Sequence, residues 1–527
     1  MKTDYKFSVL LFPLFSVLTA CGGGGGSSSS SGGGGNFPTT TLWKAGVFQP
    51  SANFEAKCAV PRAGTSDRLG TVTDQNNWLR SWSNELYLWY GEIPDRDPSL
   101  SATDAYFKLL KTPATTASGA MKDKFHFVYT TPEWVALSQS GTEAGYGAEF
   151  AVLAPFPPRH IVVAYTDPNT TAATNLARGD EILQVDGVDA VNGGTAANAD
   201  TLNAGLFPST SGESHTFQVR NTGGVTRMVT MSASSITHVP VPIVTTFASA
   251  SGPVGYMQFN DHIATAEQPL ISAINTLKAA NVTDLVLDIR YNGGGYLDLA
   301  SELAYMIGNT TLTAGKTFEK IVFNDKNPSR DPVTGELLAP TPFLSTSQGF
   351  QGAAGTPLPT LNLTRVYVIT GSGTCSASES IINSLRGAGI DVYLIGSTTC
   401  GKPYGFYPTD NCNVTYFTIQ FRGENAANFG DYTDGFSPAN TSHDVGTTVP
   451  GCSVADDFTH SMGDTTEARI AATLNFRASN NQTCPTASGF APEPTLSKAS
   501  LTKDLANRSL WVSKPAARQN RIIRRMQ

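Results

Sequence analysis

The stretch DLVLDIRYNGGG, residues 284–295, decides the fold class. Its apolar residues 285–287 lie between two aspartates, which is typical of a short buried strand. Three consecutive glycines follow, and glycine lets a backbone turn sharply and come close to a ligand. We therefore predict a buried strand that ends in a glycine-rich turn.

The same alternation of apolar strand and helix recurs on both sides of this stretch. Strand-like runs stand at 255–259, 366–369 and 392–395, and helical spacing of apolar residues marks 270–277 and 381–385. Strand–helix–strand alternation implies parallel pairing in an α/β layer. We expect residues 237–485 to form such a layer.

A second turn, GTCSASE at residues 373–379, lies between the strand at 366–369 and the next helix. Ser376 then stands at a helix N-terminus, where free N–H groups and the helix dipole favour negative charge. This position suits a nucleophilic serine. The spacing of Ser376 and Glu379 is also that of a capping box, which requires no catalysis. The local pattern leaves both interpretations open.

Lys402 is the candidate base for such a serine. It follows Ser376 by 26 residues, across one helix and one strand, a connection that can return the chain to the same sheet edge. A neutral lysine can activate a serine. Lowering a lysine pKa from about 10.4 to about 7 takes roughly 4–5 kcal/mol of discrimination against the charged form, which burial can supply. Pro403, Tyr404 and Phe406 are candidate apolar walls.

Residues 136–236 show a different pattern, of short strands and turns. A glycine-spaced loop precedes the β-rich run HIVVAY at 160–165 and the segment LARGDEILQVDG at 176–187. This order of motifs resembles a PDZ domain, in which the loop offers N–H groups to the terminal carboxylate of a peptide that adds a strand to the sheet edge. The resemblance implies peptide binding by Gly145, Tyr146, Gly147 and Ala148.

The motifs DIRYNGGG at 288–295, CSASE at 375–379 and GK at 401–402 together resemble the C-terminal processing (tail-specific) serine peptidases. In that family a PDZ-like segment precedes the catalytic core, as it does here, and the resemblance covers about residues 75–475. It implies an α/β, crotonase-like protease core that follows the β-rich PDZ-like domain. Residues 42–135 themselves look mainly helical, so we also expect a small N-terminal helical domain there.

The resemblance also assigns roles to individual residues. Ser376 matches the nucleophile and Lys402 the general base, and the N–H groups of Ala377 and of Gly293 or Gly294 would form the oxyanion hole. We therefore predict a serine endopeptidase with a Ser/Lys dyad that acts on proteins or peptides, recognises C-terminal segments through the PDZ-like domain, and uses no cofactor or metal.

The chain departs from the family pattern at Phe406. Many relatives carry a glutamine four residues after the lysine, where it orients the amine, so the partner that orients Lys402 is left open. This departure motivates one alternative function, an inactive peptide-binding scaffold. The other alternative is a carrier of apolar ligands on the same core.

Cys375 and Cys400 either pair and brace the two turns or stay separate buried thiols.

The first 21 residues are expected to be a lipoprotein signal peptide. A basic start and an apolar run at 7–18, too short for the roughly 20 residues of a membrane span, end in Leu-Thr-Ala-Cys, which resembles a lipobox. Cys21 would be lipidated, and the Gly/Ser-rich linker at 22–41 would tether the body to a bacterial cell envelope, at the outer membrane facing the periplasm or the surface. An ordinary signal peptide cleaved nearby is the alternative.

Charge and cysteine content narrow the function classes further. The net charge of −7 argues against a nucleic-acid-binding surface. Six cysteines remain after Cys21, an even number that allows up to three disulfides with fifteen connectivities. No Cys/His cluster has zinc spacing.

The tail at 486–527 ends in a basic segment, either a frayed terminus or a weak amphipathic helix that touches anionic lipid.

Overall fold

The computed structural model describes residues 43–441, 446–489 and 521–522. The described residues from Ala45 onward belong to one compact unit. The expected signal peptide with Cys21, most of the linker and most of the C-terminal tail lie outside the described residues. No helix in the described part of the chain is both long enough and apolar enough to cross a membrane.

The central sheet has six strands in the order β12-β13-β14-β18-β19-β26. These are β12 (Ile243–Phe247), β13 (Val254–Gln258), β14 (Asp284–Asp288), β18 (Arg365–Thr370), β19 (Asp391–Gly396) and β26 (Gly451–Ser453). Every neighbouring pair from β13 to β26 is parallel, and only β12 runs antiparallel to its neighbour. The α/β class expected from the sequence is confirmed.

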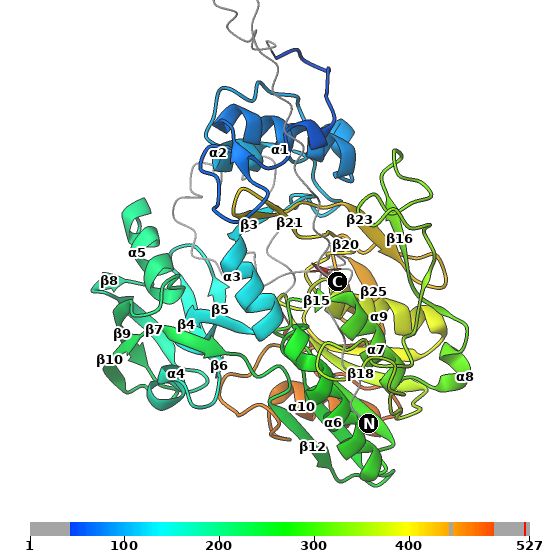
Figure 1. Ribbon diagram of the computed structural model, residues 1–527. Helices are drawn as coiled ribbons and strands as arrows, with labels where there is room; N and C mark the ends of the chain where they lie inside the picture. Colours follow the sequence, from blue (N-terminus) through cyan, green and yellow to red (C-terminus); the bar gives the residue numbers. More distant parts are fainter. Residues whose placement is uncertain (1–42, 442–445, 490–520, 523–527) are drawn as a thin grey trace, which may run out of the picture. The chain divides into compact units, whose positions relative to one another are not determined.

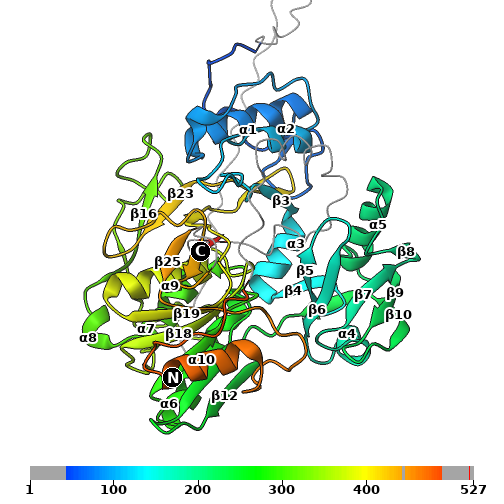
Figure 2. The ribbon, with the colours of Figure 1, turned by 180° about the vertical axis from the view of Figure 1, so that it is seen from behind.

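Helices cover both faces of this sheet (Figures 1 and 2). The covering helices are α6 (Glu267–Ala279), α7 (Leu297–Ile307), α9 (Ala377–Ala388) and α10 (Ala468–Ala478). Leu285 and Leu287 of β14 belong to the apolar cluster of α6, α7 and α9, whereas Val286 belongs to the cluster of α10. Burial on both faces explains why the strand reads as an uninterrupted apolar run.

The segment that resembles a PDZ domain has a sheet and an apolar core of its own. Its strands follow the order β10-β9-β7-β6-β5, and β5 is the terminal one. They are β5 (Ala148–Ala154), β6 (His160–Thr166), β7 (Glu181–Val185), β9 (Ser214–Arg220) and β10 (Thr226–Ser232), with β8 (Val188–Asp189) against β7 and helices α4 (Thr171–Asn175) and α5 (Ala196–Leu206). At its two ends, β4 (Thr142–Gly145) pairs with β11 (Ser234–Thr237).

The N-terminal part contains helices α1 (Val72–Leu86) and α2 (Thr103–Leu109) and the strands β1 (Lys57–Cys58), β2 (Arg68–Leu69) and β3 (Phe127–Thr130). Trp78 and Trp82 of α1 stack at 5.1 Å between ring centroids and pack on Tyr416, more than 300 residues further along the chain. The aromatic residues of α1 therefore form core contacts with a partner that is distant in the sequence.

Tyr416 belongs to the hairpin of β21 (Thr409–Asn411) and β22 (Val414–Phe417), and β22 pairs with β3. A separate four-stranded sheet contains β16 (Thr317–Phe323), β17 (Thr341–Pro342), β20 (Tyr404–Gly405) and β23 (Phe421–Glu424). The short elements are α3 (Thr131–Val135), α8 (Thr310–Thr313), β15 (Gly295–Tyr296), β24 (Phe436–Pro438), β25 (Thr447–Val449) and β27 (Arg521–Ile522).

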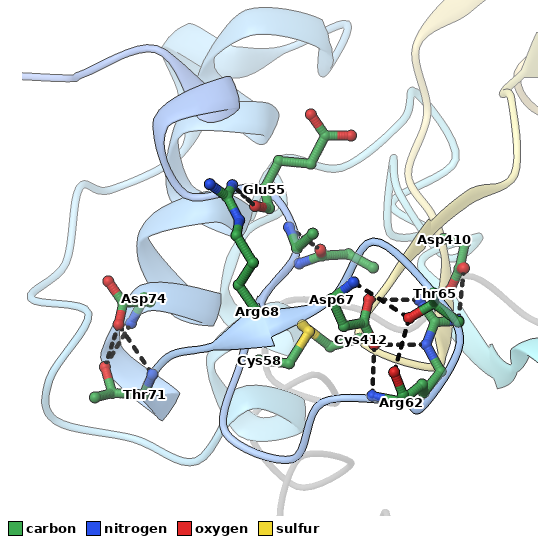
Figure 3. Close-up of a disulfide and its surroundings, with 12 residues drawn as sticks. Glu55, Cys58, Arg62, Thr65, Asp67, Arg68, Thr71, Asp74, Asp410 and Cys412 are labelled. Atoms are coloured by element: carbon green, nitrogen blue, oxygen red, sulfur yellow. Dashed lines mark hydrogen bonds and ion pairs between the residues drawn. A yellow bond between two sulfur atoms is a disulfide. The ribbon is translucent and has the colours of Figure 1, made fainter. Parts of the chain in front are cut away.

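Three disulfides link the six cysteines outside the signal segment: Cys58–Cys412, Cys375–Cys400 and Cys452–Cys484. The first joins β1 to the β21–β22 hairpin across 354 residues. Arg62 supports the same junction by ion pairs with Asp67 and Asp410 (Figure 3). The disulfide therefore holds the N-terminal part on the hairpin.

We predict that the double substitution Cys58→Ala with Cys412→Ala lowers the free energy of unfolding by about 2–4 kcal/mol, because the disulfide closes a very long loop of the unfolded chain. Denaturant unfolding at fixed pH measures the loss. Val60→Ala, in the same loop but at a side chain that is 81% exposed, is the matched control and should stay within about 0.5 kcal/mol of the wild type. An unchanged double variant would contradict the bracing role.

Candidate active site

Three turns meet where β14, β18 and β19 end. Parallel register brings these carboxyl ends to one sheet edge, with Asp288 beside Ile369 and Thr370 beside Gly396. Hydrogen bonds then join the turns, since the Cys375 N–H donates to Asn292 O at 3.0 Å and the Cys400 N–H to Thr374 O at 3.0 Å. The glycine turn, the turn of Ser376 and the turn of Lys402 are thus brought together.

Ser376 adopts a left-handed backbone conformation, with φ of 62° and ψ of −117°, immediately before α9. Such a φ is costly for a residue other than glycine, and strained residues of this kind gather at functional sites. Its Oγ is buried and accepts or donates no hydrogen bond among the described residues. The local form is that of a capping box, but the hydroxyl itself stays available for chemistry.

Glu379 links the serine turn to the lysine turn. Its carboxylate accepts the N–H of Ser376 at 2.9 Å and those of Gly401 and Lys402 at 2.8 Å each, together with the Thr399 hydroxyl. Burial raises the pKa of Glu379, and the hydrogen bonds oppose that shift. The sequence indicated Glu379 only as a capping partner, because the two further N–H groups that it accepts come from a turn more than 20 residues away.

The disulfide between Cys375 and Cys400 joins the same two turns, with a Cα–Cα distance of 5.2 Å. The sequence left open whether these cysteines pair or stay separate buried thiols, and in the structure they pair. The sulfurs lie within 4.8 Å of a Glu379 oxygen, a spacing that metal ligands have. In the disulfide neither sulfur is a thiolate, which is the form that binds metal ions, so this cluster is a brace.

Lys402 is fully buried, and its Nζ lies over two aromatic rings, 4.9 Å from the Phe125 centroid and 4.5 Å from that of Phe406. Burial lowers the pKa of Lys402 to about 7, against the opposing charges of Asp123 and Glu379. Phe406 thus forms one wall, as expected. The other wall, Phe125, was missed because it lies in the N-terminal part, almost 280 residues earlier in the chain.

Asp123 fixes the position of Phe125. It accepts the Phe125 N–H at 2.9 Å and the Tyr87 hydroxyl at 2.7 Å, and all three residues are buried. An aromatic pair therefore surrounds the amine at the place where relatives were expected to use a glutamine. The ring faces attract the amine when it is charged, but burial by the same rings outweighs this attraction and lowers the pKa of Lys402.

The amides expected to form an oxyanion hole differ in their hydrogen bonding. The Gly294 N–H donates to Asn292 Oδ1 at 2.9 Å and is therefore engaged. The N–H groups of Gly293 and Ala377 donate to no acceptor among the described residues. Ala377 is the first residue of α9, where backbone N–H groups are free. This leaves Gly293 and Ala377 as the candidate pair.

A buried ionic network around Arg290 stabilises the start of the glycine turn. Arg290 donates to Asp288, Glu467 and Asp456, with its side chain fully buried, and the Tyr256 hydroxyl donates to Asp288 at 2.7 Å. Removing one member of such a network would leave an unpaired buried charge. The sequence showed Asp288 and Arg290 only as part of a motif, because the distant partners of Arg290, Asp456 and Glu467, come from the segment before α10.

Gly145, Tyr146, Gly147 and Ala148 stand at the junction of β4 and β5. Gly147 has a φ of 78°, and its carbonyl accepts the Asp167 N–H at 2.7 Å. The Tyr146 hydroxyl donates to Gly205 O of α5 at 2.9 Å, so its ring is buried in the core. The loop therefore leads directly into the terminal strand of its sheet.

Residues 253–407 match the family described as Peptidase family S41. The match covers less than a third of the chain, and we call the matched part the S41 domain. The matched range holds the glycine turn, Ser376 and Lys402, and the family implies a serine-type hydrolase. No curated protein sequence matches the chain.

Solved structures resemble the S41 domain and its flanking parts. A putative S41 protease from Bacteroides fragilis has a TM-score of 0.55 and 21% identity, over 77% of this chain and 98% of its own. The photosystem II D1 C-terminal processing protease has a TM-score of 0.43 and 19% identity, over 72% and 94%. The PDZ domain of a carboxy-terminal protease from Vibrio cholerae, solved with a peptide, has a TM-score of 0.14 and 17% identity, over 18% and 97%. The first similarity supports the fold.

We predict that Lys402→Met stabilises the protein, and more so at pH 6 than at pH 10. With a pKa of about 7 when folded and about 10.5 when unfolded, the unfolded chain binds more protons between these values. The wild type is therefore penalised by roughly 4–5 kcal/mol below pH 7 and regains this stability as the pH rises toward 10.5.

Denaturant unfolding of both proteins at the two pH values measures the difference. The same substitution at Lys320, whose side chain is half exposed, is the matched control and should change stability little at either pH. A Lys402→Met protein that is less stable than the wild type at pH 6 would show that the amine is charged and paired.

Proposed function

We propose that the protein is a serine endopeptidase in which Ser376 is the nucleophile and Lys402 the general base. One observation carries the proposal: a fully buried lysine with a pKa of about 7 is joined, through a disulfide and a shared carboxylate, to a strained serine. A neutral amine of this pKa can remove a proton from a hydroxyl near neutral pH.

The reaction follows from these positions. The Lys402 Nζ lone pair takes the Ser376 Oγ proton while Oγ forms a bond to the peptide carbonyl carbon. The N–H groups of Ala377 and Gly293 donate to the negative carbonyl oxygen. The C–N bond then breaks, and the lysine proton passes to the leaving amine. Water, deprotonated by the same amine, hydrolyses the acyl-serine and restores the free enzyme.

The PDZ-like part is proposed to capture the C-terminal segment of a protein substrate. Strand β5 is terminal in its sheet, so its outer edge can hydrogen-bond an added peptide strand. The loop of Gly145 to Ala148 stands at the start of this strand, where backbone N–H groups can receive a terminal carboxylate. Strand addition supplies affinity with little dependence on sequence, which suits a peptidase of unfolded chains.

Lipid attachment is proposed from the sequence alone. The Leu-Thr-Ala-Cys ending and the glycine- and serine-rich residues that follow support a tether at Cys21 in a bacterial cell envelope, with exported proteins as substrates. The alternative of an inactive scaffold was motivated by Phe406. This residue lies against the Lys402 amine and helps to bury it, so it is compatible with a functional base.

Mass spectrometry of the products from an unfolded test protein tests the dyad. We expect Ser376→Ala and Lys402→Ala each to lower kcat by at least about 10³-fold, as loss of a nucleophile or base does. For the wild type, kcat/KM should rise with pH through an apparent pKa near 7, because only the neutral amine is a base. Cleavage by Ser376→Ala at the wild-type rate would refute the assignment.

A second experiment tests capture of the C-terminus. We expect amidation of the substrate C-terminus to raise KM about tenfold or more with little change in kcat, because the loop at 145–148 loses a charge-assisted partner. Acetylation of the substrate N-terminus is the matched control. Equal KM values for the free and amidated peptides would argue against this role of the PDZ-like part.

A further inference from the structure

The glycine turn cannot hold its own amides in one direction. Gly294 and Gly295 have φ angles of 95° and 143°, in a region that glycine enters freely, and a glycine backbone has many alternative conformations. An oxyanion hole stabilises a transition state only when its donors are held in place before the reaction. The turn that carries the candidate amide of Gly293 therefore needs restraints from outside.

Asn292, which directly precedes the three glycines, contacts both the serine turn and the glycine turn. Its carbonyl oxygen accepts the Cys375 N–H and the Ser378 hydroxyl, each at 3.0 Å. A peptide unit is rigid, so these bonds also fix the plane that contains the Gly293 N–H. The side-chain Oδ1 of Asn292 accepts the Gly294 N–H at 2.9 Å. One fully buried residue thus restrains the amides of the glycine turn.

The orientation of the Asn292 carboxamide is determined by its partners. Its Nδ2 donates to Phe259 O at 2.9 Å, and its Oδ1 lies 3.0 Å from His262 Nδ1. A carboxamide oxygen can only accept, so His262 Nδ1 carries the proton of this hydrogen bond. His262 is therefore the second donor, beside the Gly294 N–H, that keeps Oδ1 directed at the turn.

His262 is also joined to the glycine turn by its own backbone. Its N–H donates to Gly294 O at 3.3 Å, and its carbonyl oxygen accepts the Tyr296 N–H at 2.9 Å. A Cβ atom at Gly295 would lie 2.4 Å from that carbonyl oxygen, so this close approach requires glycine. His262 therefore restrains Gly294 on both sides, through its backbone at the carbonyl and through Asn292 at the N–H.

The imidazole of His262 acts here in its neutral form. The side chain is fully buried and packs on Phe259, with 4.4 Å between ring centroids. Its Nε2 has no hydrogen-bond partner among the described residues. Burial lowers the pKa of His262 to about 3, against the hydrogen bond to Asn292. The ring is therefore an uncharged donor throughout the pH range in which the Lys402 amine changes its charge.

His262 is not placed as a base for Ser376. Ser376 Oγ and His262 Nε2 both lack a partner among the described residues, so these two atoms do not hydrogen-bond each other. The other ring nitrogen, Nδ1, is engaged with Asn292. The imidazole therefore reaches the reaction through the glycine turn and not through the serine hydroxyl.

We propose that His262 is a positioning residue, which acts through Asn292 to hold the amides of the glycine turn in the arrangement that receives the oxyanion. The proposal rests on the proposed function, since an oxyanion forms only during acyl transfer. Because the oxyanion is absent from the bound substrate, loss of the imidazole N–H should weaken the transition state and leave substrate binding intact.

Kinetics of the full-length protein on an unfolded test protein measure this difference. We expect His262→Leu to lower kcat about 10²-fold while KM changes less than about twofold. His262→Asn, whose Nδ2 can take the place of the imidazole Nδ1, should keep kcat within about fivefold of the wild type. His460→Leu, at a histidine whose side chain is 44% exposed, is the matched control and should leave kcat unchanged.

A double substitution tests whether His262 acts through Asn292. Asn292→Ala removes the carboxamide, so adding His262→Leu to it should lower kcat no further. Losses that multiply overturn the proposal, as does a His262→Asn protein that is as slow as His262→Leu. The apparent pKa of kcat/KM should stay near 7 in His262→Asn, because Lys402 remains the base, and a displaced pKa also contradicts the positioning role.

Nitrogen NMR of the wild-type protein with isotope-labelled histidine needs neither catalysis nor a folded variant. We expect one imidazole that stays neutral and protonated on Nδ1 between about pH 5 and pH 9, which is His262. His126, whose side chain is also buried, is the internal reference, because its Nε2 donates to Phe107 O and its tautomer is the opposite one.

The NMR result separates the two proposals. If the Nδ1 tautomer is observed and the wild type cleaves no substrate, the proposed function fails while the contact of His262 with Asn292 stands. The absence of a neutral ring protonated on Nδ1 overturns the positioning role whatever the activity. If His262→Leu does not fold, as thermal unfolding would show, this measurement and the kinetics of His262→Asn decide.

Discussion

Glu379 accepts backbone N–H groups from both Ser376 and Lys402, residues that are separated in the chain by one helix and one strand. The rest of the site depends on this contact. The serine is held in a strained conformation, and the lysine is held without the solvent that would normally surround it. A carboxylate with several donors and a disulfide between the adjacent cysteines stabilise both turns at once. Because the restraint acts on the backbone, neither functional atom is consumed by it.

Burial then determines the chemical state of the amine. The rings of Phe125 and Phe406 exclude water from Lys402 Nζ, which disfavours the charged form. This burial requires the S41 domain and the N-terminal part to pack against each other, because that packing brings Phe125 to Lys402. The disulfide of Cys58 with Cys412 and the aromatic contact of α1 with Tyr416 secure that packing. Contacts far from the site therefore keep Lys402 buried, and burial keeps its pKa low.

Charged side chains also hold the PDZ-like part and the S41 domain in contact. Residues of both parts line one small cavity beside the glycine turn. Arg178 of the PDZ-like part reinforces this contact through Asp456, whose other partners include Arg290 below the glycine turn. The PDZ-like part and the glycine turn therefore share one ionic network.

By itself, the sequence determined the α/β class, the parallel strands, the glycine turn and the candidate pair of Ser376 and Lys402. The strands and the turn depend on local patterns, since a buried strand needs an apolar run and a sharp turn needs glycine, whereas the pair of Ser376 and Lys402 was assigned by the resemblance of three motifs to a peptidase family. The tertiary structure alone decided that Cys375 pairs with Cys400, that Phe125 forms a wall of the lysine site, and that Asn292 engages Gly294 and leaves Gly293 free. These are contacts between segments far apart in the chain, and their spacing in the sequence carries no information about their distance in space.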